Sequence, residues 1–191
     1  MKIFYRAIFK EVGCEVSEED CIYFTKISLQ EAFLYKVKTP TPELIEKFRN
    51  KCDEVVESGI LLDHNVPYED TLPFINYVKE NNIKCGIVTG NDTYHVNKVF
   101  NNLNIKDFTS FIIGSYDLKK QKPDPEGILL ALERNNMLEN KKNICYIGDA
   151  YNDFLAAKRA GVVPILIDRN HELKESDEYI VIHDLMDLFN D

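Results

Sequence analysis

Short, mostly apolar runs, each about as long as one strand, alternate with helix-length segments through the second part of this sequence. The runs lie at 84–89, 111–114, 143–147, 164–167 and 179–182. Continuous apolar runs of this length are typical of parallel strands that are buried on both faces of a sheet. The intervening segments at 72–82, 93–103, 125–137 and 153–160, and a last one at 185–189, are predicted to be helices. The chain from Pro67 onward is therefore expected to form an α/β domain.

Before Pro67 the pattern is helical throughout. Apolar residues recur at three-to-four spacing from Tyr5 to Val12, and Gly13 is a plausible helix stop. Three further helix starts carry capping signals, which are Ser17 with Asp20, Ser28 with Glu31, and Thr41 before Pro42. Nothing in this stretch resembles a strand. We expect two domains, a helical one at 1–66 and an α/β core at 67–191.

The charge balance narrows the possible partners. The sequence has 23 Lys+Arg against 32 Asp+Glu, which gives a net charge of −9. An acidic chain repels phosphate backbones and anionic headgroups, so neither nucleic acid nor a membrane is expected as a partner. No apolar run approaches the ~20 residues that span a bilayer, and the first residues lack a signal-peptide pattern.

The cysteine pattern favours a reducing compartment. The five cysteines are odd in number and include no Cys-x-x-Cys pair, which argues against a disulfide framework or a zinc site. A cytoplasmic location is therefore expected. Cys85 and Cys145 fall within apolar runs, and we expect both to be small core residues.

Polar residues suited to phosphate follow two of the predicted strands. Ligands of parallel α/β folds bind beyond the carboxyl ends of the strands. Thr89, Gly90 and Asn91 follow the first strand, so the Thr89 hydroxyl and the Gly90 amide are expected to bind a phosphoryl oxygen. Lys122 lies between the second strand and its helix, where its ammonium could offset charge on a transferring phosphoryl group.

Two carboxylates follow the third strand. Asp149 comes directly after it, and Asp153 lies four residues later, in the first turn of the next helix. Both offer the hard oxygen ligands that Mg²⁺ prefers. Ordinary structural roles are also open: Thr89 as a helix cap, Lys122 as a solvated loop charge, and Asp153 as a partner of the helix dipole. The ordered combination is what favours a functional site.

These segments resemble the motifs of the haloacid dehalogenase superfamily. Residues 87–91 are similar to the second family motif, 122–127 to the third, and 146–153, running on to 157–161, to the fourth. The closest comparison is the branch of phosphoglycolate phosphatase-like and β-phosphoglucomutase-like enzymes, in which a helical cap is inserted early. The resemblance covers nearly the whole chain, with 1–66 as the cap, and implies a Rossmannoid parallel sheet.

The resemblance implies a Mg²⁺-dependent phosphomonoesterase that acts on a small phosphorylated metabolite. In this family an aspartate attacks phosphorus, and a second aspartate two positions later serves as general acid and base. Water then hydrolyses the aspartyl-phosphate. Thr89 would bind the phosphate, Lys122 would steady the nucleophile and the phosphoryl group, and Asp149 with Asp153 would hold the metal.

The sequence departs from the family at the nucleophile. No Asp-x-Asp occurs in the 191 residues, and the first residues already resemble the first cap helix. A misplaced start codon, a shortened chain or a decayed gene would each produce this pattern. The family's central strand would also be missing, leaving a gap of ~10 Å between its neighbours, for self-association or a partner strand to fill. We expect weak Mg²⁺ binding and little activity.

Other functions are less well supported. A catalytically inactive binding or regulatory protein of the same family is the main alternative. A dehalogenase needs no Mg²⁺, so the paired aspartates argue against it, and no Gly-x-Gly-x-x-Gly or P-loop favours a nucleotide-binding protein. Lys26 and Ser28 lie where relatives place specificity residues, although a solvated lysine and a helix cap would explain them. Related mutases carry an arginine near Leu29, and its absence disfavours mutase activity.

Overall fold

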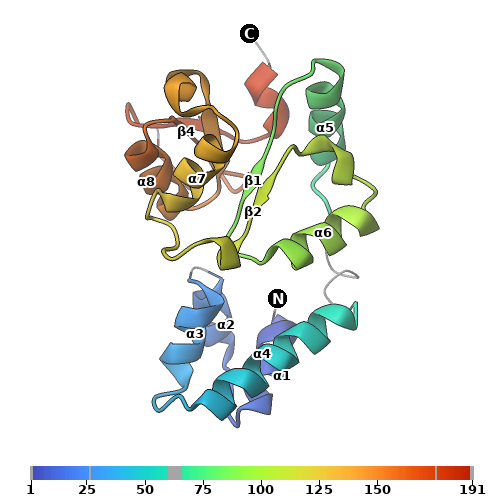
Figure 1. Ribbon diagram of the computed structural model, residues 1–191, viewed down its shortest axis with the longest axis vertical. Helices are drawn as coiled ribbons and strands as arrows, with labels where there is room; N and C mark the ends of the chain where they lie inside the picture. Colours follow the sequence, from blue (N-terminus) through green and yellow to red (C-terminus); the bar gives the residue numbers. More distant parts are fainter. Residues whose placement is uncertain (1, 26, 60–65, 175, 190–191) are drawn as a thin grey trace. The chain divides into compact units, whose positions relative to one another are not determined.

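The computed structural model describes residues 2–25, 27–59, 66–174 and 176–189 (Figure 1). The chain divides into two compact units, Met1–Val66 and Pro67–Asp191. Within these described ranges, no helix has the length and apolar character needed to cross a membrane.

The described part of the first unit is helical. Its helices are α1 (Lys2–Glu11), α2 (Glu18–Phe24), α3 (Leu29–Lys36) and α4 (Pro42–Glu57). The predicted caps are present: the Ser17 hydroxyl accepts from the Asp20 amide, the Ser28 hydroxyl from the Glu31 amide, and the Thr41 hydroxyl from the Leu44 amide. Gly13 follows α1 with φ +72°, a conformation that glycine adopts without strain.

Aromatic side chains fill the centre of this unit. Phe9 is fully buried, with ring centroids 5.1 Å from Phe24 and 5.1 Å from Phe48. Phe33 lies 4.6 Å from Phe48, which joins α3 to α4. The Tyr5 hydroxyl donates to the carbonyl of Phe24 at 2.9 Å, and burial raises the pKa of this phenol. The four helices therefore close a core of their own.

The second unit is the α/β domain that the sequence predicted. Its strands are β1 (Ile87–Val88), β2 (Ile112–Ile113), β3 (Cys145–Gly148), β4 (Val163–Ile167) and β5 (Ile180–Ile182). Its α-helices are α5 (Thr71–Glu80), α6 (Thr93–Asn102), α7 (Glu126–Arg134) and α8 (Tyr151–Ala160). Short 3-10 helices are η2 (Lys106–Phe108), η3 (Ser115–Asp117), η4 (Leu138–Asn143) and η5 (Leu185–Phe189). The helix expected at 125–137 thus ends at Arg134, and the last helix is of the 3-10 type.

The strands form two parallel sheets instead of the one sheet expected. β1 pairs with β2 (Figure 1). β3, β4 and β5 pair in that order. The two sheets are linked by a side chain: the hydroxyl of Tyr146 on β3 donates to the Val88 carbonyl of β1 at 3.1 Å. This division agrees with the expected interruption of the sheet. Among the strands of the described residues, β1 and β3 each pair along one edge only.

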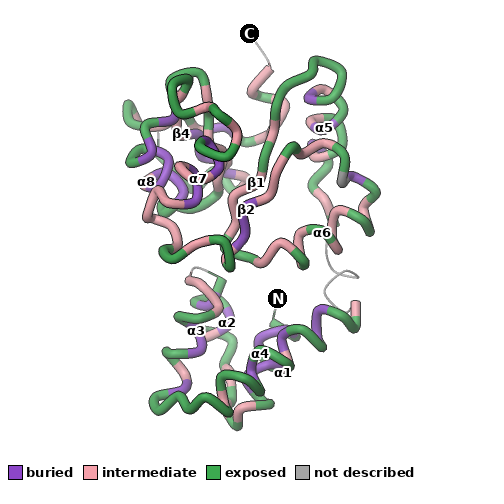
Figure 2. Tube along the Cα trace, in the orientation of Figure 1, coloured by how far each residue is buried: buried purple, intermediate pink, exposed green. Residues whose placement is uncertain are grey.

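Helices α7 and α8 cover one face of β3. Ile128 and Leu132 of α7 cluster with the α8 alanines at 156, 157 and 160, and Tyr146 packs against this cluster. Figure 2 shows buried residues along the inner face of α8, whereas β1 is only half-buried. The expectation that Cys145 is a core residue is wrong: its neighbours Ile144 and Tyr146 pack against the α7 and α8 cluster, so Cys145 lies on the opposite face of β3, where it is exposed. Cys85 is half-buried.

Candidate functional site

The turn from β3 into α8 positions Asp153. Its Oδ2 accepts from the Ala150 amide at 3.0 Å, an interaction that caps the helix, and the residue is only 4% exposed. Gly148 makes room for this carboxylate, since a Cβ built there would lie 2.2 Å from the Asp153 Cβ. Any larger residue at 148 would displace the acidic side chain.

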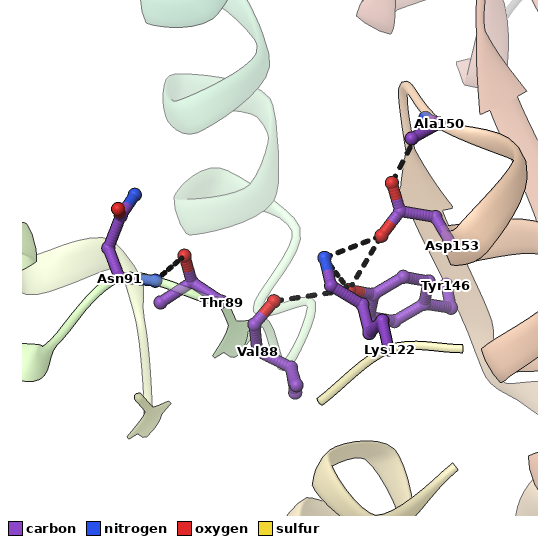
Figure 3. A network of polar contacts seen from close by, with 7 residues as sticks. All are labelled: Val88, Thr89, Asn91, Lys122, Tyr146, Ala150 and Asp153. Carbon is purple, nitrogen blue, oxygen red and sulfur yellow. Dashed lines mark hydrogen bonds and ion pairs between the residues drawn. The ribbon is translucent and has the colours of Figure 1, made fainter. Parts of the chain in front are cut away.

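Lys122 and Asp153 form a largely buried ion pair. The Lys122 ammonium lies 2.6 Å from Asp153 Oδ1 and 3.3 Å from the Tyr146 hydroxyl (Figure 3). Burial by itself would lower the pKa of Lys122, but Tyr146 and Asp153 outweigh it, and the pKa is raised. Burial is also the main reason why the pKa of Tyr146 is raised. At neutral pH the site therefore holds a fixed positive charge beside a neutral phenol.

Thr89 follows β1 at the same end of the sheet. Its amide donates to the Ile113 carbonyl at 3.0 Å, and its hydroxyl accepts from the Asn91 amide at 3.1 Å (Figure 3). A hydroxyl that accepts one hydrogen bond can still donate its proton. Gly90 and Asn91 are exposed, and the space where a Gly90 side chain would lie contains only the Gln121 Oε1, 3.8 Å away. The turn can thus present the Gly90 amide and the Thr89 hydroxyl to a ligand.

One polar network joins the ends of β1 and β3. Lys122, Asp153, Tyr146 and the Val88 carbonyl are linked by hydrogen bonds, and Thr89 is the next residue after Val88. Asp149 follows Gly148 directly and is exposed, outside this network as drawn in Figure 3. The predicted residues of 89–91, Lys122 and Asp153 therefore gather near one edge, and Asp149 flanks them.

The donor set fits a Mg²⁺ ion that is weakly held. Asp149 is free to turn toward solvent, but both carboxylate oxygens of Asp153 already have partners, the Lys122 ammonium and the Ala150 amide. Over the described ranges, no three His, Cys, Asp or Glu side chains are grouped to hold a metal. Mg²⁺ commonly keeps several waters and takes one or two carboxylates plus the phosphate oxygens of a ligand. Of these, Asp149 and Asp153 can supply the carboxylates.

Sequence reasoning missed Tyr146, whereas the cap expected as the structural role of Ser28 is present. The alternation of side chains along a strand could have indicated Tyr146. Residues 146 and 148 lie on the same face of a strand that ends at the site. Ser28 is a helix cap, with its hydroxyl also 2.8 Å from Glu31 Oε2. Lys26 lies outside the described residues.

The fold and the site together define a class, a parallel α/β domain with a lysine, a threonine and aspartates beyond the carboxyl ends of its strands. The sequence model of the haloacid dehalogenase-like hydrolases matches residues 1–167. The chain belongs to this family.

Individual relatives support the same branch. The chain is 30% identical over 156 residues to a phosphoglycolate phosphatase of Salmonella choleraesuis, covering 80% of this chain and 59% of that protein. It therefore spans a little over half the length of this relative. A haloacid dehalogenase-like hydrolase structure from Bacteroides fragilis has a TM-score of 0.78 at 25% identity, covering 97% of this chain and 90% of the other. A β-phosphoglucomutase structure from Clostridium difficile has a TM-score of 0.77 at 23% identity, covering 98% and 84%.

Proposed function

We propose that this chain carries the phosphate- and Mg²⁺-binding part of a phosphomonoester hydrolase site for a small phosphorylated metabolite. The observation that supports it is the Lys122–Asp153 pair, held at 2.6 Å beside the end of β1, where Thr89 follows. A buried ion pair costs desolvation and contributes little net stability, so a stability role alone explains it poorly. The names of the phosphatase relatives agree with this class of reaction.

Each residue has a separate task in this proposal. The Thr89 hydroxyl and the Gly90 amide donate to phosphoryl oxygens, beside Asn91, whose own backbone amide donates to the Thr89 hydroxyl. Lys122 stays protonated because its pKa is raised, and it neutralises charge that develops on the phosphoryl group. Asp149 and Asp153 would hold Mg²⁺, which would polarise the phosphoryl oxygens when bound.

Binding and charge neutralisation do not supply a nucleophile. Phosphoryl transfer by a covalent route needs a group held in line with the leaving oxygen. Asp149 and Asp153 have the metal-binding role in this proposal, and no Asp-x-Asp occurs in the sequence to supply a separate nucleophile. The 191-residue chain should therefore bind phosphate but turn over little or no p-nitrophenyl phosphate.

A pair of matched fusions tests the nucleophile. One variant carries an added N-terminal apolar strand that ends in Asp-x-Asp, and its control carries the same strand ending in Asn-x-Asn. If the strand enters between β1 and β3, both variants gain stability, and only the first hydrolyses p-nitrophenyl phosphate with Mg²⁺. Sedimentation of the unmodified chain shows whether a second copy fills the gap instead. Robust turnover by the unmodified chain would contradict the proposal.

Phosphate binding tests the remaining residues. Calorimetry with inorganic phosphate and Mg²⁺ should show binding that Thr89→Val and Lys122→Met each weaken by roughly tenfold or more, since each loses a hydrogen bond to a charged group. Lys158→Met is the matched control, because Lys158 is a solvent-exposed lysine of α8 that pairs with Glu178. Equal losses in all three variants would mean that general charge, not this site, attracts phosphate.

A catalytically inactive binding or regulatory protein is the second candidate. It is favoured by the self-contained Lys122–Asp153–Tyr146 network, which satisfies the acidic group without a metal. An Asp-x-Asp fusion that folds, binds phosphate and remains inactive would support this candidate over the hydrolase.

A further inference from the structure

The segment that carries Lys122 has no regular structure of its own. Residues 118–125 lie between η3 and α7, and they form bends and turns that belong to no helix or strand. The segment contains three lysines, of which Lys119 and Lys120 are exposed, whereas the Lys122 side chain is only 26% exposed. Contacts made by side chains must therefore fix which of these lysines turns toward Asp153.

Glu126 holds the N-terminal end of this segment. Its Oε1 accepts from the Lys119 amide at 2.9 Å, and its Oε2 accepts from the Lys120 amide at 3.0 Å. Hydrogen bonds to an ionised group are roughly twice as strong as those between neutral groups. Glu126 is also the first residue of α7, where a carboxylate favours the helix dipole. The dipole explains an acidic residue, but binding two successive amides requires the two acceptor oxygens of a carboxylate.

Arg159 holds the other end of the segment. Its Nη1 donates to the Pro123 carbonyl at 2.7 Å, directly after Lys122. Arg159 and Asp153 both belong to α8 and lie six residues apart, which is about 9 Å along the helix axis. Asp153 binds the Lys122 ammonium at 2.6 Å (Figure 3), and Arg159 binds the backbone at its base. The tip and the base of this lysine are thus both tied to one helix.

We propose that Glu126 and Arg159 are positioning residues, which set where the Lys122 ammonium lies. The inference rests on the proposed function, in which this ammonium faces a phosphoryl group. A lysine is a compact charge on a flexible stem, so its location depends on the backbone that carries it. A group that acts on a ligand must be held to within about 0.5 Å by its supporting residues. Loop amides occupy both carboxylate oxygens of Glu126, so this residue acts through Lys122.

Phosphate calorimetry with Mg²⁺ tests the effect on binding. Glu126→Gln and Arg159→Met should each weaken binding roughly three- to tenfold, because each removes a charge-assisted hydrogen bond that holds the segment. Arg159→Lys can still donate to a carbonyl and should retain most of the affinity. The matched controls are Glu133→Gln, at an exposed residue of α7, and Lys158→Met in α8. Losses in the controls as large as those in the test variants would contradict the proposal.

A double-mutant cycle with Lys122→Met separates positioning from direct contact. If Arg159 acts through the ammonium, Arg159→Met should cause no further loss of affinity once Lys122 is replaced. The same reasoning applies to Glu126→Gln. A further loss of the same size in the Lys122→Met background would mean that these residues act on the phosphate or on the whole fold, and the proposal would fail.

A second measurement needs no phosphate. In NMR spectra of the chain with isotope-labelled lysine, the Lys122 ammonium is identified by its absence in Lys122→Met. Its bonds to Asp153 and Tyr146 should slow the exchange of its protons with water. Glu126→Gln and Arg159→Met should speed this exchange many-fold, and Arg159→Lys should restore it.

The NMR result distinguishes this inference from the proposed function. Fast exchange at Lys122 in the unmodified chain, or exchange that neither variant changes, would overturn the inference. A change in exchange in both variants, together with no phosphate binding by the unmodified chain, would support the positioning roles and contradict only the proposed function.

Discussion

The two units of this chain bury their apolar side chains to different extents. In the helical unit Ile8 and Phe9 are 0% exposed, at the centre of a closed aromatic core. In the α/β unit β3 is only partly covered, with Cys145 exposed and Ile147 half-buried. Both units have ordinary apolar sequences, so composition does not explain the contrast.

The difference lies in what each element needs as a neighbour. A capped amphipathic helix satisfies its own backbone and must cover only one stripe, which the other helices of Met1–Val66 do. A strand in a buried sheet needs a partner along both edges, because its free amides and carbonyls are costly to bury. β1 and β3 each have one paired edge, and the site lies between them.

Truncating one isoleucine in each unit should measure directly how far the two units differ in core packing. Ile8→Ala removes a side chain with no solvent exposure and should cost about 3 kcal/mol, because it leaves a cavity in a packed core. Ile147→Ala removes a half-buried side chain beside the gap and should cost about half as much. Urea unfolding followed by far-UV circular dichroism compares the two variants. A larger loss for Ile147→Ala would show that the α/β unit is packed more tightly than its exposure indicates.

Local signals in the sequence predicted the helical unit well. Ser17, Ser28 and Thr41 are the caps of α2, α3 and α4, and each acts on an amide three residues away. The strand positions were also predicted, because short apolar runs have few alternatives between helices. The proximity of Lys122 and Asp153 could be predicted because the carboxyl ends of parallel strands meet at one edge.

Non-local pairing set the remaining features. The exposure of Cys145 depends on what covers the face of β3 opposite α7 and α8, which the residues near Cys145 do not determine. The 3-10 helix η5 is held by distant groups: the Asp70 carboxylate accepts from the Leu185 amide at 2.7 Å, and the Phe189 ring stacks on Tyr77 at 3.8 Å. Tyr146 was overlooked for the same reason, since its partners Val88 and Lys122 are far away in the sequence.

Gly148→Ala should disturb the site more than it disturbs the fold. The added methyl would meet the Asp153 Cβ at 2.2 Å, so the carboxylate must move away from Lys122, at a cost of about 2 kcal/mol. The affinity for phosphate should also fall, because Lys122 is then no longer held in place by Asp153. Gly90→Ala is the matched control for stability, because its Cβ would meet only the Gln121 Oε1, at 3.8 Å. Calorimetry with phosphate and urea unfolding are the two measurements, and equal destabilisation by both variants would contradict the steric argument.

The smallest expected effect is a difference between the two units in how their folding stability depends on pH. In the helical unit the hydrogen bond from Lys36 is the main reason why the pKa of Asp20 is lowered. A lowered carboxyl pKa gives stability that is present above the unfolded value of about 3.9 and is lost as pH falls through the folded pKa. In the α/β unit the raised pKa of Lys122 gives stability that is present below about 10.4 and is lost as pH rises through the folded pKa.

Two variants separate these pH effects. Asp20→Asn should flatten the loss of stability on the acid side by less than about 1 kcal/mol, as for other single ion pairs near a surface. It should leave the remaining acid loss, to which the lowered pKa values of Asp168 and Asp187 contribute. Lys122→Arg should instead flatten the alkaline side, because a guanidinium keeps its charge at any pH that the fold survives. Urea midpoints across the pH range give both slopes. An alkaline slope that is the same in Lys122→Arg and the unmodified chain would show that the titrating group there is not Lys122.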